Sequence, residues 1–161
     1  MMKKSKKSLL LLIGSYLIIF GIGYGIGICS FPLLSPEKTL TLSEIKDVKD
    51  KARYVGVFTK NQKGSNLEHW VDGKIYVSEK ELAFEGNISP RTTPEIYLTK
   101  TQANDEESFL KIKNESLYIG YINTFGNFKK NIPNNANIDE YTAIQIWCGR
   151  FEKFLGSAKY K

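Results

Sequence analysis

The chain has 161 residues and a formal net charge of +6 at pH 7. Its four leading lysines, Lys3, Lys4, Lys6 and Lys7, precede every acidic residue; without them the 23 basic side chains fall to 19, against 17 acidic ones. The remainder is close to neutral, which argues against a nucleic-acid-binding protein, because such proteins carry excess basic residues on their folded part. The length left after an N-terminal apolar segment suffices for one domain and excludes two.

The first predicted element is a transmembrane anchor over residues 9–31. No charged residue occurs from Leu9 to Ile28, and twenty helical residues span about 30 Å, the thickness of the hydrocarbon core of a bilayer. The lysines in residues 1–8 predict a cytoplasmic N-terminus, which puts everything after about Phe31 outside. We therefore expect a single-pass protein of a bacterial inner or plasma membrane whose first partner is the lipid bilayer.

Two alternatives to a permanent anchor stay open. A signal peptide would be cleaved, although this apolar segment is longer than usual and no A-x-A-like site follows it. Cys29 is a candidate for lipidation, although a lipid-accepting cysteine usually follows a small residue and here follows Ile28. Small-x-x-x-small glycine pairs further predict that the anchor associates with itself. These pairs are Gly21 with Gly25 and Gly23 with Gly27.

Residues 32–53 are predicted to be a linker with one short helix. Pro32 and Pro36 favour an extended start. Thr41 and Glu44 have the spacing of a capping box, which predicts a surface helix over 43–51.

The hydrophobic period changes at Tyr54, where short runs of aromatic and β-branched residues begin. The predicted strands are 54–59, 69–77, 82–84, 95–99, 117–122 and 142–147. Strands at this spacing, with no long helical pattern between them, predict a mainly β fold, an antiparallel β-sandwich or barrel-like domain over residues 54–161.

Three polar sites are candidates for chemistry. Residues 104–107 are predicted to be a solvated loop, and the asparagines and acids of 134–140 a turn, because their spacing fits no EF-hand. His69 is the only histidine, which excludes a multi-histidine metal centre. No metal site is predicted and the sequence leaves any cofactor unknown. No catalytic motif stands out, so we do not expect a self-sufficient enzyme.

Cys148 is the only cysteine of the outer domain, so it has no partner there for an internal disulfide. Strand alternation directs Ile144, Ile146 and Cys148 to one face and Trp147 to the other. If the first face is the core, Cys148 is an inert buried residue. If the strand ends or bulges at Gly149, the sulfur lies near Arg150, whose charge would favour the thiolate.

The C-terminal part resembles the DM-thirteen domain, also called the electron-transfer DM domain. The positions that carry the resemblance there are Gly120, Gly126, Ile132, Pro133, Ile138, Tyr141, Ile144, Ile146, Trp147, Cys148, Phe151, Phe154, Gly156 and Ala158. Earlier in the chain, His69 and Gly73 are similar to the family's opening strand, and Pro94, Tyr97 and Leu98 to its Pro-x-x-x-Tyr-Leu strand. The resemblance covers about residues 54–160.

The resemblance implies a β-rich extracytoplasmic domain with a redox role for Cys148. Trp147 would then be its aromatic neighbour and His69 a second group if the fold brings it close. Glu152 and Lys153 depart from the family pattern, as does the turn at 91–93, where a glycine is common.

Two functions remain, and they predict different environments for the sulfur. In the first, the domain is a thiol-based redox or electron-transfer accessory that acts on a redox protein partner, and the sulfur is accessible. In the second, it is a membrane-tethered module that binds a surface partner; the sulfur is then buried, and an aromatic or charged patch is exposed elsewhere.

Overall fold

The computed structural model describes residues 6–34, 38–90 and 92–161, with the side chains of 6 and 29–34 outside that description. The chain forms two units, Met1–Ser35 and Pro36–Lys161.

The first unit contains one helix, α1 (Lys6–Leu34), which extends beyond the predicted 9–31 segment. Its stretch Lys7–Ile28 is long and apolar enough to cross a membrane, a property that a signal sequence shares. Cys29 is part of α1, but its side chain is outside the described residues.

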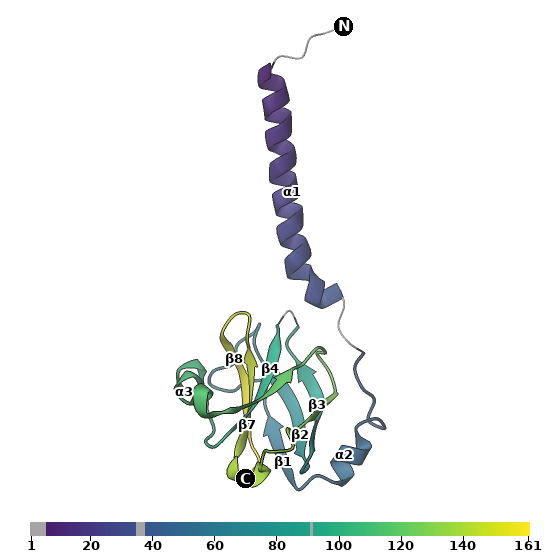
Figure 1. Cartoon of the computed structure of the whole chain (residues 1–161), viewed down its shortest axis with the longest axis vertical. Coiled ribbons are helices and arrows are strands. Elements are labelled where there is room, and N and C mark those ends of the chain that lie inside the picture. Colours follow the sequence, from purple (N-terminus) through teal and green to yellow (C-terminus); the bar gives the residue numbers. More distant parts are fainter. Residues whose placement is uncertain (1–5, 35–37, 91) are drawn as a thin grey trace. The chain divides into compact units, whose positions relative to one another are not determined.

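The second unit is built from two antiparallel four-stranded sheets (Figure 1). The first has the order β1-β2-β3-β6, with β1 Tyr54–Phe58, β2 Val71–Val77, β3 Glu81–Ile88 and β6 Phe128–Asn131. The second has the order β5-β4-β7-β8, with β5 Leu117–Tyr121, β4 Pro94–Thr99, β7 Ala143–Cys148 and β8 Lys153–Lys159. The predicted mainly β fold is confirmed, in its sandwich form.

The core lies between the sheets and takes apolar side chains from both. Phe84 of β3 and Ile146 of β7 are among its fully buried members. The sheets approach each other at β1 and β8, where a Cβ atom added to Gly56 would lie 3.1 Å from that of Ala158. One side of the sandwich is therefore nearly closed, as in a barrel.

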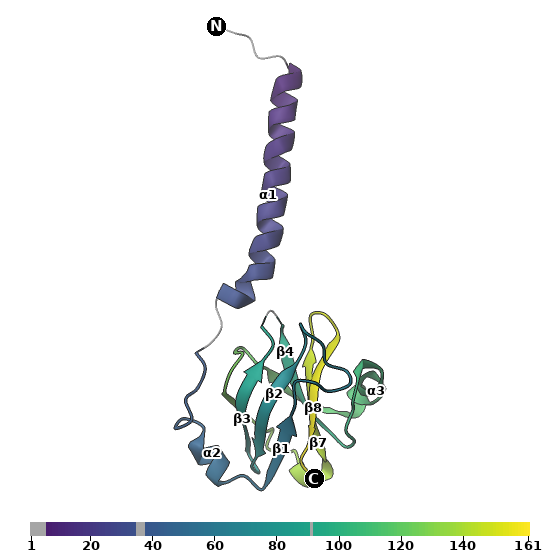
Figure 2. The same ribbon diagram turned by 180° about the vertical axis from the view of Figure 1, so that it is seen from behind.

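Two short helices cover the outer faces of the sheets (Figures 1 and 2). Helix α2 (Lys46–Asp50) packs Val48, with the preceding Ile45, against Ala83 of β3. Thr41 and Glu44 do exchange hydrogen bonds, of 2.7 and 3.3 Å, but the helix begins later than predicted, at Lys46.

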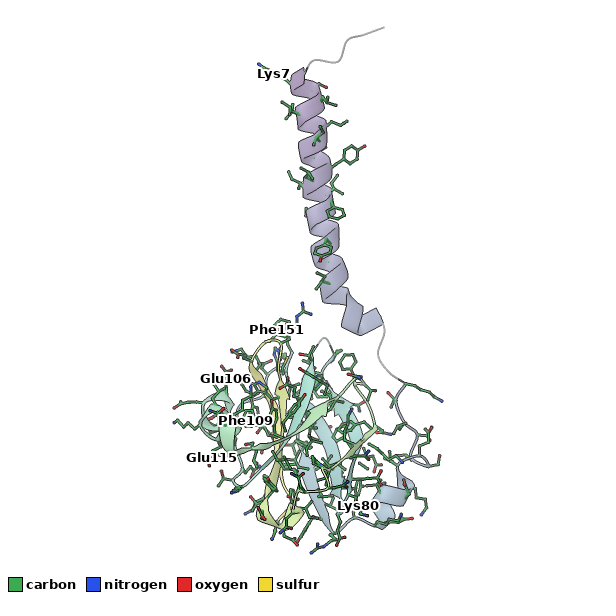
Figure 3. All side chains as sticks on the ribbon, viewed as in Figure 1. Lys7, Lys80, Glu106, Phe109, Glu115 and Phe151 are labelled. Atoms are coloured by element: carbon green, nitrogen blue, oxygen red, sulfur yellow. The ribbon has the colours of Figure 1, made fainter. Side chains whose placement is uncertain are left out.

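Helix α3 (Glu106–Ile112) corrects the prediction of a loop at 104–107. Asp105 is its N-cap: a carboxylate oxygen of Asp105 accepts a hydrogen bond from the backbone N–H of Ser108 at 2.9 Å. The helix places Phe109 against the outer face of the second sheet (Figure 3), so the acidic stretch begins a helix that covers part of the core.

The prediction also missed strands β6 and β8. β6 is an edge strand with one apolar residue, Phe128, and β8 contains Gly156 and Ser157, which rarely indicate a strand. Asn137 caps a 3-10 turn at Ile138–Glu140, consistent with the predicted turn at 134–140.

Candidate redox site

Cys148 is the last residue of β7, between Pro94 of β4 and Lys153 of β8. Its thiol is free, and the residue is fully buried on the inner face of the sheet with Ile144 and Ile146. The predicted alternation of β7 is therefore correct. The accessible sulfur expected for a surface redox thiol is not found in this conformation.

Thr93 covers the sulfur at the end of the strand. Its Oγ1 lies 3.9 Å from the Sγ of Cys148 and accepts a hydrogen bond from the backbone N–H of Arg150 at 3.0 Å. The Thr93 carbonyl accepts a further bond from the N–H of Gly149 at 3.1 Å. A single residue thus holds both the sulfur and the turn that follows it.

The sequence left open that the Arg150 guanidinium lies near the sulfur, and the structure shows a different contact for it. The guanidinium carbon lies 5.4 Å from the ring centroid of Phe151, and it is the backbone of Arg150 that bonds Thr93. The turn continues through Glu152, whose φ of 51° is in the left-handed region. Lys153 then pairs with Glu106 of α3 at 2.9 Å.

Trp147 adjoins Cys148 in the chain but lies on the opposite face of the sheet. It is fully buried, with its ring 5.0 Å from that of Phe109 and with Tyr97 and Phe154 in the same cluster. Among the described residues its indole N–H has no hydrogen-bond partner. Trp147 therefore packs beneath α3 and does not share the apolar environment of the sulfur.

His69 lies at the same end of the sandwich as the turn after Cys148. Its ring is 6.2 Å from that of Phe151, edge to face, and its Nδ1 is buried with no partner among the described residues. The carbonyl of the adjacent Trp70 accepts a hydrogen bond from the backbone N–H of Ser89 at 2.9 Å, and the Trp70 N–H donates one to the Ser89 hydroxyl at 3.1 Å. Ser89 starts the loop leading to Thr93. The fold therefore joins His69 to the loops around Cys148, although not to the sulfur itself.

Sequence reasoning missed two features of this region. The sequence shows Thr93 only as part of a divergent turn, and its contact with the sulfur depends on the pairing of β4 with β7. Glu95 belongs to no motif, yet it accepts a hydrogen bond from the phenol of Tyr97 at 2.6 Å. The spacing of Glu95 and Tyr97 on one strand was the available signal, because residues two apart share a face.

Chemically, the site contains a protected thiol beside a loop and a turn that hydrogen bonds through Thr93 hold together. Within residues 6–34, 38–90 and 92–161, no three His, Cys, Asp or Glu side chains are grouped to hold a metal ion. The fold and site together define a small β-sandwich module, preceded by one apolar helix, with a single sheltered cysteine.

A family profile described as Electron transfer DM13 matches residues 63–160, which is more than half of the chain. The protein therefore belongs to the electron transfer DM13 family, and the resemblance seen in the sequence is confirmed. Comparisons with curated proteins and with solved structures gave no match. Membership of this family supports a redox or electron-transfer role for the module.

Proposed function

We propose that the protein is a membrane-anchored, extracytoplasmic redox module in which Cys148 exchanges electrons with a partner protein through its thiol. The observation that carries the proposal is the free cysteine, held by Thr93 at the end of β7 in a domain of the electron transfer DM13 family. The apolar stretch Lys7–Ile28 and the lysines before it support the anchor and its orientation.

The proposed reaction is thiol–disulfide exchange. The Cys148 thiolate attacks one sulfur of a partner disulfide, a Cys148–partner disulfide forms, and the other partner sulfur leaves as a thiolate. A thiolate from a further thiol then attacks the partner sulfur of the mixed disulfide and forms a new disulfide with it, and Cys148 leaves as a thiolate that regains its proton. Because the sulfur is buried, the loop at Thr93 and the turn at Gly149 and Arg150 must open before the attack.

The test is the rate at which a thiol reagent labels Cys148 in the folded full-length chain, with Cys29→Ser as background. The matched control is a cysteine buried elsewhere in the core, Val77→Cys in a Cys148→Ala chain, since Val77 is also fully buried. We expect Cys148 to react through local opening, faster than the control thiol at position 77 and with little dependence on denaturant. Equal rates that both follow global unfolding would refute the proposal.

A second function, binding without redox chemistry, is favoured by the full burial of Cys148. In that case the exposed rings of Tyr118 and Tyr121, at 42% and 58% exposure, are a candidate contact surface. Labelling of Cys148 only on global unfolding is the result that this function predicts.

A further inference from the structure

A second group suited to electron transfer lies on the outer face of the second sheet, away from the sulfur. Tyr97 is only 7% exposed, and its phenol donates a hydrogen bond to Glu95 Oε2 at 2.6 Å. Glu95 is half-buried on the same strand. Gly149 leaves space for the carboxylate, because a Cβ atom there would collide with it. The structure thus holds a buried phenol against a carboxylate.

Two further tyrosines connect this pair to the surface. The ring of Tyr97 is 5.2 Å from that of Tyr118, which is 6.0 Å from that of Tyr121. Exposure rises from Tyr97 through Tyr118 to Tyr121. Electron tunnelling weakens steeply with distance, so three oxidisable rings in close succession give a better route than one long transfer.

We infer that Tyr97 is a redox-active tyrosine whose proton passes to Glu95 and whose electron leaves through Tyr118 and Tyr121. The acceptor is a strongly oxidising metal centre that takes one electron at the exposed ring of Tyr121. The phenol O–H bond breaks, the proton binds the Glu95 carboxylate, and the acceptor is reduced by one electron. A neutral tyrosyl radical and a neutral carboxylic acid remain, and return of one electron reverses both changes.

The proton transfer follows from burial. Oxidation without it would leave a cation on a ring among apolar side chains, which is costly. Burial and the adjacent Glu95 also raise the pKa of Tyr97. The carboxylate accepts that proton without any movement of the backbone.

The route ends at Tyr97 even though aromatic packing continues inward through Phe109 to Trp147. The indole N–H of Trp147 has no acceptor among the described residues, so an oxidised indole has no group to take its proton. The Lys113 ammonium lies 5.4 Å from the Trp147 ring and 5.9 Å from the Tyr97 ring, so it does not distinguish the two. Cys148 is not needed either, because it lies on the inner face of the sheet.

The test oxidises the full-length chain in detergent micelles with photogenerated tris(bipyridine)ruthenium(III). Radicals are trapped by rapid freezing and read by electron paramagnetic resonance. We expect a long-lived tyrosyl signal that is lost in Tyr97→Phe and forms more slowly in Tyr121→Phe. Glu95→Gln retains an acceptor oxygen but takes up no proton, so it should suppress the signal as well. Circular dichroism checks that each variant is folded.

The matched control is Tyr76→Phe, which removes a phenol bonded to Glu85 at 2.9 Å on the other sheet. It should leave the signal unchanged. A signal that survives in Tyr97→Phe, or that falls equally in Tyr76→Phe, overturns the inference. Cys148→Ala should keep the full signal, so a failure of the thiol proposal and a failure of this one are separable.

Discussion

Two substitutions of Cys148 measure how apolar the surroundings of the sulfur are. Cys148→Ala removes one buried atom, about the size of a methylene group, and should cost about 1 kcal/mol. Cys148→Ser adds a hydroxyl, and the polar neighbour Thr93 Oγ1 lies 3.9 Å from the sulfur that it replaces. That exceeds the reach of an O–H···O bond, about 2.5–3.0 Å. An unsatisfied buried hydroxyl costs about 1–3 kcal/mol, so serine should lose about 2–4 kcal/mol in all.

The assay is thermal unfolding of the full-length chain in detergent, followed by tryptophan fluorescence, to which the buried Trp147 and the half-buried Trp70 both contribute. A loss of 1 kcal/mol lowers the midpoint by about 4 °C for a domain of this size. We expect the order wild type, alanine, serine from most to least stable. Serine as stable as alanine, or more stable, would mean that the site is hydrated and would contradict the burial argument.

Three other predictions follow from the packing and the backbone. Phe109→Ala should lower the free energy of unfolding in urea by about 3–5 kcal/mol, because it opens a cavity between α3 and the sheet. The control is Leu110→Ala on the same helix; since Leu110 is 47% exposed, this change should alter stability by less than about 0.5 kcal/mol. Burial raises the pKa of Tyr118 to about 12 and also raises that of Tyr160. An unfolded tyrosine has a pKa of about 10, so the free energy of unfolding should be constant below that pH and fall above it. Ultraviolet absorbance would follow the ionisation of the tyrosines, and circular dichroism would follow unfolding. Ionisation of all tyrosines at about pH 10 in the folded state would contradict the prediction. Glu152→Gly should raise the midpoint by a few degrees, because a left-handed conformation costs about 1–2 kcal/mol in most residues other than glycine, and the extra chain entropy of glycine, about 0.5–1 kcal/mol, offsets only part of that. A lower midpoint would show that the turn is not strained.

The features of the fold that depend on local hydrophobic periodicity could be predicted from the sequence. In residues 144–148 the β-branched alternation identified both faces of the strand, and the structure buries Cys148 and Trp147 on opposite sides. Strand β6 was missed because its single apolar residue, Phe128, gives no period, and the strand exists through its pairing with β3. Helix α3 was missed because its 7 residues are too few for a helical pattern.

The contacts of the site could not be predicted in the same way. The position of Thr93 over the sulfur depends on the register of β4 against β7, and that of His69 beside Phe151 on the closure of two loops. Family resemblance located Cys148 but does not specify its exposure. The ring succession from Tyr97 to Tyr121 likewise arises only when β5 pairs with β4.

The strand order also has a consequence for biosynthesis. Strand β7 lies inside the second sheet between β4 and β8, and β8 ends only at Lys159. The ribosome makes the chain at about 5–20 residues per second and domains fold as units. The sandwich therefore cannot close until its final strand has emerged, and until then the apolar faces of the earlier strands stay uncovered.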